Sequence, residues 1–132
     1  MIETVKCLSR FDVRHLLISG QATVLYGAAE FSEDIDLWVS PDQENLNRLL
    51  AALGHLDARV GQLTPLVTEA HARFGHAFHF AVTEPDGQLW PLDVLGQPPR
   101  VDDFESAFAA AVTPLRSLPE IKTIDPMRLV AL

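Results

Sequence analysis

Hydrophobic positions along the chain alternate between two spacings, one of three to four residues and one of two. The first spacing predicts amphipathic helices, and the second predicts strands with one buried face. Predicted helices cover residues 3–11, 21–26, 41–53, 66–73, 104–111 and 126–132, and predicted strands cover residues 13–19, 34–39, 76–83, 88–95 and 121–124. The 132 residues contain no repeat, low-complexity tract or flexible linker, so we expect a single α/β or α+β domain.

Capping residues predict the ends of two of these helices. Ser40 is the expected N-cap of the third helix, with Gln43 completing a capping box, and Gly54 is its expected end. Asp102 and Glu105 form a second capping box ahead of the fifth helix.

A hairpin is predicted between the strands over residues 76–83 and 88–95. Residues 84–87 between them read Glu-Pro-Asp-Gly, an order in which proline presets the turn and glycine accepts a positive φ. Pro91 lies inside the second strand of the hairpin. Because proline cannot donate to a strand ladder, we expect this strand at an edge of the sheet or at a bulge.

The formal charge of −8 limits the classes of partner. Proteins that grip a nucleic acid backbone need clustered Lys and Arg side chains, since phosphate contacts supply most of that affinity. The ten basic residues here are scattered along the chain and form no run. We therefore expect no long DNA or RNA ligand for this domain alone, while a small substrate with metal-bound phosphates stays compatible.

Cysteine and hydrophobic content indicate a cytoplasmic protein. Cys7 is the single cysteine, which excludes an internal disulfide and fits either a reducing compartment or a small buried side chain. No apolar run approaches the length of a membrane span, and the first residues lack a signal-peptide pattern. We therefore expect no membrane contact.

Two acidic residues in a predicted strand are the first candidates for chemistry. Alternate strand residues share a face, so Asp34 and Asp36 are expected to point the same way, while Ile35 and Leu37 point into the protein. Carboxylates held side by side repel one another unless a cation lies between them. Mg²⁺ prefers such oxygens together with those of a substrate phosphate. The alternative is two acids that face solvent at the start of a strand.

The residues before this acidic pair add a possible phosphate-binding turn. An apolar strand runs into Gly20, and the short helix that follows could bind phosphate with its N-terminal amides. Together, residues 20–27 and 31–39 resemble the signature of the polymerase-β-like nucleotidyltransferase superfamily. The resemblance is greatest to its small bacterial members, related to toxin and antibiotic nucleotidyltransferases.

This resemblance implies both a fold and a reaction. The implied fold is a mixed sheet of four or five strands flanked by helices. The implied reaction is Mg²⁺-dependent transfer of a nucleoside monophosphate from a nucleoside triphosphate, such as ATP, to a hydroxyl of a small molecule or protein. The implied ligands of two Mg²⁺ ions are Asp34, Asp36 and Asp93, and the implied phosphate-binding residues are Gly20, Gln21 and Ser32. For Asp93, capping a loop or pairing with an arginine is an equal alternative.

Two residues inside the resembling segment support a different class of function. Gln21 stands where the family has a second Gly or Ser, and Glu30 adds a negative charge beside the expected triphosphate. They favour a catalytically inactive module that acts in protein assembly, as a homodimer or with a partner protein of toxin–antitoxin type. A third reading, a glycosyltransferase-like Asp-x-Asp metal site, needs a longer chain.

Other conspicuous side chains are expected to be structural. His76 and His79 fall on opposite faces of their strand and cannot easily converge, so we expect no zinc site. Trp38, Phe104 and Phe108 are expected in the core. The apolar end of the chain, residues 127–132, is expected to dock on the domain or on a second subunit, or else the natural domain continues beyond it.

Overall fold

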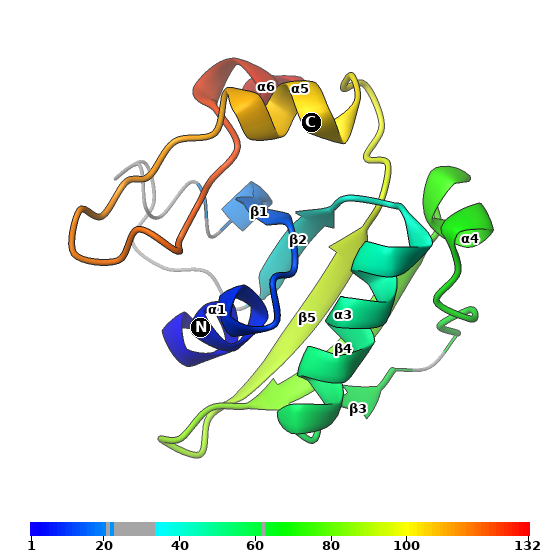
Figure 1. Cartoon of the computed structure of the whole chain (residues 1–132), viewed down its shortest axis with the longest axis vertical. Coiled ribbons are helices and arrows are strands. Elements are labelled where there is room, and N and C mark those ends of the chain that lie inside the picture. The colour runs from blue at the N-terminus through cyan, green and yellow to red at the C-terminus, as the bar shows by residue number, and fades with distance from the viewer. Residues whose placement is uncertain (21, 23–33, 62) are drawn as a thin grey trace.

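Five strands form one mixed sheet in the computed structural model, which describes residues 1–20, 22, 34–61 and 63–132 (Figure 1). The strands are β1 (His15–Ile18), β2 (Ile35–Val39), β3 (Arg59–Val60), β4 (Ala77–Thr83) and β5 (Leu89–Leu95). The helices are α1 (Ile2–Arg10), α3 (Gln43–His55), α4 (Glu69–Arg73), α5 (Phe104–Ala109) and α6 (Pro126–Ala131). The predicted α/β class and strand number are therefore confirmed for the described residues.

The order of strands across the sheet is β1-β2-β5-β4-β3. β2 and β5 run parallel to each other, and every other neighbouring pair is antiparallel. β5 is an interior strand, so the expectation from Pro91 that it lies at an edge is wrong. Its pairing with β2 begins at Leu92, opposite Ile35, so Pro91 lies just outside that ladder and its missing N–H is tolerated there.

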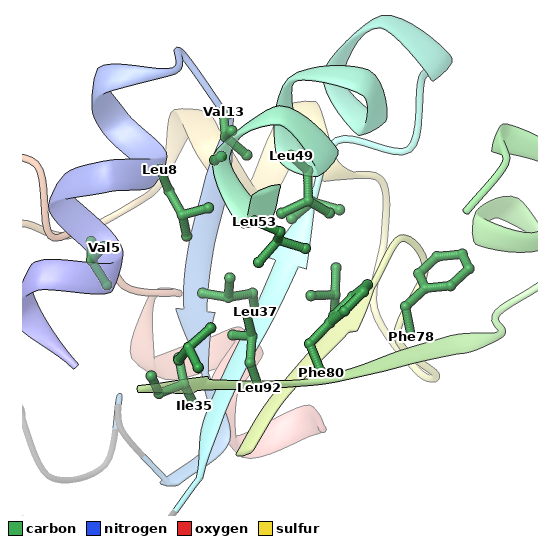
Figure 2. Close-up of a cluster of buried hydrophobic side chains, with 14 of the residues drawn as sticks. Val5, Leu8, Val13, Ile35, Leu37, Leu49, Leu53, Phe78, Phe80 and Leu92 are labelled. Atoms are coloured by element: carbon green, nitrogen blue, oxygen red, sulfur yellow. The ribbon is translucent and has the colours of Figure 1, made fainter. Parts of the chain in front are cut away.

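The main core lies between one face of the sheet and the helices α1 and α3 (Figures 1 and 2). The side chains labelled in Figure 2 are Val5, Leu8, Val13, Ile35, Leu37, Leu49, Leu53, Phe78, Phe80 and Leu92. Every second residue of β2 and β4 enters this layer, as strand geometry requires. The residues between them, including Asp36 and His79, therefore belong to the opposite face.

A smaller core covers part of that opposite face. Leu16 and Ile18 of β1 pack there with Trp38 of β2 and Phe104 of α5. The Trp38 indole lies edge-on to the Phe104 ring, with centroids 5.7 Å apart, and its Nε1–H donates to the Gly96 carbonyl over 3.1 Å. Trp38 and Phe104 are thus core residues, as expected. The side chains of this smaller core do not extend over the polar residues of β5 and β4.

The start and end of α3 differ from the capping prediction. The N-cap is Asp42, not Ser40, and its carboxylate accepts the backbone N–H of Asn45 over 2.9 Å. The Ser40 hydroxyl supports this cap by donating to Asp42 over 2.5 Å. Gly54 does not end the helix, which continues through one more residue, and the chain leaves it where Asp57 adopts a φ of 52°.

The caps of α5 and α4 also lie later than predicted. Asp103, not Asp102, caps α5 by accepting a backbone N–H of its first turn over 2.7 Å. Asp102 instead pairs with Arg128 of α6 over 2.6 Å, which ties the two helices together. The helix predicted over residues 66–73 begins at residue 69, because the Thr68 side chain caps it there.

The last part of the chain returns to the outer edge of β1 without forming the strand predicted over residues 121–124. Thr123 makes isolated bridges to Leu17 and to Val112. Leu129 and Leu132 then pack against the smaller core, while Met127 and Val130 are 83% and 85% exposed. The apolar end thus docks on the domain through one side of α6.

Several further features of the fold bear on the sequence analysis. Cys7 is fully buried in the main core, as its alternative reading as a small apolar side chain predicted. β3 is a two-residue strand that the hydrophobic pattern did not predict, since both of its residues are exposed. The described segments contain no helix long and apolar enough to cross a membrane. The helix predicted over residues 21–26 falls outside the described residues except for Ala22, which is buried.

Candidate functional site

Polar side chains form one row across the centre of the sheet. Asp36 of β2 is the register partner of Asp93 on the parallel strand β5, and Asp93 is opposite His79 on β4. On the other side of Asp36, its register partner on β1 is the apolar residue Ile18, where the row of polar side chains ends. Directly opposed residues share a face and lie close together, so two carboxyl groups and an imidazole meet where the smaller core ends.

The surroundings of the Asp36 carboxyl disfavour its charged form. The pKa of Asp36 is raised from 3.8 to about 6, mainly by burial and further by the negative charges of Asp93 and Asp34 and by a hydrogen bond with Asp93. Like charges at one site disfavour ionisation of each other. In the absence of a cation, Asp36 therefore holds a proton over much of the acidic range and shares it with Asp93.

The other predicted site residues lie at different distances from this pair. Asp34 is exposed at a bend just before β2, so the strand is one residue shorter than predicted, yet its charge acts on Asp36. Gly20 is half-buried and lies just after β1, in the helical conformation. Gln21, Ser32 and Glu30 lie outside the described residues.

His79 is a site residue that the sequence analysis assigned only a structural role. Its Nδ1–H donates to Oδ1 of Asp93 over 2.6 Å, and about half of its side chain is exposed. The position of the turn was a usable signal. A hairpin centred on Asp86 places His79 directly opposite Asp93, so the pair follows from the turn once its centre is known.

The backbone of His79 is fixed by the segment that follows β3. The Thr64 hydroxyl accepts the His79 N–H and donates to the His79 carbonyl, each over 3.1 Å. The N–H of Gly61 donates to the same carbonyl over 2.7 Å. A Cβ at Gly61 would lie 2.9 Å from the His79 Cβ, so only glycine allows this approach. His79 is thus a rigid hydrogen-bond donor beside Asp93.

The donor set fits a hard cation better than zinc. Asp36 and Asp93 supply carboxylate oxygens whose mutual repulsion a divalent ion would relieve. No group of three or more His, Cys, Asp or Glu side chains is arranged to hold a metal within the described ranges. Mg²⁺ commonly takes one or two carboxylates and completes its shell with water and substrate phosphates, so a pair is sufficient for it.

Comparison with known proteins gives no family for this chain. No protein-family model matches it, and no curated protein matches it.

Proposed function

We propose that this domain is a Mg²⁺-dependent nucleotidyltransferase of the polymerase-β-like type. It moves a nucleoside monophosphate from a nucleoside triphosphate to a hydroxyl group of a small molecule or a protein. The order of chemistry-bearing elements supports this proposal: a glycine after β1, one carboxylate just before β2, one on β2 and a further carboxylate on β5.

One observation carries the proposal. Asp36 and Asp93, which are 57 positions apart in the sequence, are register partners on adjacent parallel strands, and their carboxyl groups share a hydrogen bond. The Asp93 charge beside the half-buried Asp36 carboxyl opposes ionisation of Asp36, which weakens the fold at neutral pH. Binding of a divalent cation is a chemical reason to retain such a pair.

The residues take distinct roles in this reaction. Asp36 and Asp93 would hold Mg²⁺, and Asp34 would add negative charge from the bend before β2. The bound ion supplies neutralisation of the phosphate charge. Gly20 would allow the backbone to approach a phosphate closely, and Gln21 and Ser32 are the proposed partners of the remaining phosphate oxygens. His79 keeps the Asp93 carboxylate in one orientation.

Titration calorimetry tests the proposal directly. We expect saturable Mg²⁺-dependent binding of a non-hydrolysable nucleoside triphosphate by the wild type, and loss of that binding in a protein carrying Asp34→Asn and Asp36→Asn. An Asp86→Asn variant, which changes an exposed turn carboxylate far from the pair, is the matched control. Absence of Mg²⁺-dependent binding by the wild type would overturn the enzymatic proposal.

Removing the His79 donor is expected to weaken metal binding without abolishing it. His79→Phe deletes the hydrogen bond to Asp93, whereas His79→Asn keeps an N–H donor near the Nδ1 position. Because partners of metal ligands typically contribute 10- to 100-fold, we expect about a tenfold loss of Mg²⁺ affinity for His79→Phe and partial recovery for His79→Asn. Mg²⁺ titration followed by calorimetry measures both. Equal affinities of wild type and His79→Phe would contradict this role.

The His79 contact also supports a second candidate function. Asp93 accepts hydrogen bonds from His79 and from the protonated Asp36, so the row is satisfied without a metal ion. This arrangement suits a catalytically inactive module that acts in protein assembly. Analytical ultracentrifugation distinguishes the two functions. An assembly module is expected to self-associate or bind a partner protein equally well with and without Asp36→Asn.

A further inference from the structure

The tertiary structure gathers basic side chains that are dispersed in the sequence. A cavity of about 540 Å³ lies at the start of β1, and Arg14, Arg48 and Lys122 border it. A second cavity of about 310 Å³ shares Ser9 and Glu120 with the first and adds Lys6 and Arg10. Five of the ten Lys and Arg residues thus surround two adjoining cavities in a chain with a net charge of −8. We call the larger cavity the basic groove.

Two of these cations are held over one aromatic ring. The Arg14 guanidinium carbon is 4.8 Å from the centroid of Phe108, and the Lys122 ammonium is 4.5 Å from the same centroid. Arg14 is also fixed by both carboxylate oxygens of Glu105, at 2.5 and 2.7 Å. Within the described residues, no carboxylate forms an ion pair with Lys122. The positive charge of Lys122 is therefore held in place at the groove, on a side chain that is half-buried.

A buried imidazole beside the groove has an unused acceptor. The Nδ1–H of His15 donates to the Val13 carbonyl over 2.8 Å, so Nε2 carries the lone pair of the neutral ring. Nε2 is buried and has no hydrogen-bond partner among the residues that the structure describes. Burial lowers the pKa of His15, and the nearby Lys122 charge acts in the same direction, so the ring stays neutral. Asp12 and Glu120 add two carboxylates at the lining.

We propose that the basic groove binds a phosphate ester that carries free hydroxyl groups, such as a sugar phosphate. Lys122 supplies positive charge for the phosphate. Arg48, which is also paired with Glu44 over 3.0 Å, adds a second guanidinium at the lining. Asp12 and Glu120 supply acceptors for hydroxyl groups, which a simple anion lacks. The volume of about 540 Å³ lies within the range of small-molecule sites.

This site is separate from the carboxylate row. His15 pairs with Val39 at one end of the β1–β2 ladder, whereas Ile18 pairs with Asp36 at the other end. Ile18 is three positions beyond His15 along β1, a separation of roughly 10 Å along the strand. The inference therefore does not depend on the proposed nucleotidyl transfer.

Ribose 5-phosphate is a suitable probe, titrated by calorimetry in the presence of a chelator so that no divalent metal contributes. We expect saturable binding by the wild type, at least about tenfold weaker binding by Lys122→Met, and unchanged binding by Arg116→Met. Arg116 is an exposed cation elsewhere on the chain and is the matched control. A protein with Asp36→Asn and Asp93→Asn is expected to bind the probe as the wild type does.

Two further ligands test the chemical class. Inorganic phosphate and free ribose are each expected to bind at least about tenfold more weakly than ribose 5-phosphate. Backbone amide resonances of Arg14, His15 and Lys122 should shift on addition of the ester, which locates the site even where a variant folds poorly. No saturable binding, equal affinity for inorganic phosphate, or unchanged affinity in Lys122→Met would overturn the inference.

Discussion

Replacing Asp36 with asparagine is expected to abolish the proposed nucleotidyl transfer while making the metal-free protein more stable. The loss of transfer should be about a thousandfold or more, because the proposed metal ion would lose a ligand, and with it several kcal/mol of charge neutralisation. The gain in stability follows from the neighbouring carboxyl, since asparagine occupies the same space without adding a charge beside Asp93. Opposite effects on activity and stability are the mark of a residue kept for function.

The stability gain depends on pH in a defined direction. The Asp36 carboxyl has a pKa of about 6 in the folded protein and 3.8 as its ordinary value, so the folded state binds the proton more tightly. Stability of the wild type is therefore highest below pH 3.8 with respect to this group and falls as the pH rises to about 6. Because the side chain is only half-buried, we expect about 1–2 kcal/mol of this loss, below the roughly 3 kcal/mol that the full pKa difference implies.

Urea denaturation of the metal-free proteins at pH 5 and pH 8 measures this effect. The free energies of unfolding of Asp36→Asn and wild type should differ more at pH 8 than at pH 5, with the variant the more stable. Asp86→Asn serves as the control, because its carboxylate is exposed in the hairpin turn. A variant less stable than the wild type at pH 8 would mean that the Asp36–Asp93 contact is not repulsive.

The largest loss of stability is expected from Trp38→Ala. Trp38 is fully buried, packs edge-on against Phe104 and holds the Gly96 carbonyl through Nε1–H. Replacing a buried tryptophan with alanine typically costs about 3–5 kcal/mol, from lost apolar contacts and the cavity left behind. The cavity would open between β2 and α5, next to the strand that carries Asp36.

Two companion variants separate the causes of this loss. Trp38→Phe keeps an aromatic ring but leaves the Gly96 carbonyl without its donor, and we expect it to cost about 1–3 kcal/mol. Phe74→Ala removes an aromatic side chain that is 86% exposed, and we expect a change within about 0.5 kcal/mol. Urea unfolding gives all three values. Equal losses for Trp38→Ala and Phe74→Ala would show that Trp38 does not support this core.

The sequence was a good guide to the elements and a weaker guide to their ends. The hydrophobic periods predicted β2, α3 and the hairpin because one face of each is buried by a large apolar surface. Helix starts were misplaced because several polar residues near Ser40 and near Asp102 can act as caps. At α5 the alternative cap, Asp102, is paired with Arg128 instead. At α3 the alternative cap, Ser40, donates its hydroxyl to the cap that is used, Asp42.

The candidate site depends partly on local spacing and partly on contacts between strands. Asp34 and Asp36 belong to one short segment, so a local spacing was enough to propose them. Asp93 needed the parallel pairing of β2 with β5, and the sequence alone left its role open. His79 was expected to be structural because it shares no face with His76, whereas its actual partner, Asp93, lies on the neighbouring strand.

The sequence by itself determined the alternation of helices and strands, the acidic net charge and the spacing of Asp34 and Asp36 at the start of β2, because these are properties of local order and composition. Only the tertiary structure decided that Asp93 and His79 complete a row with Asp36. It also decided that half of the scattered basic residues surround two adjoining cavities. The physical reason is that strand order and helix packing are set by the burial of the whole apolar surface, which no local segment specifies.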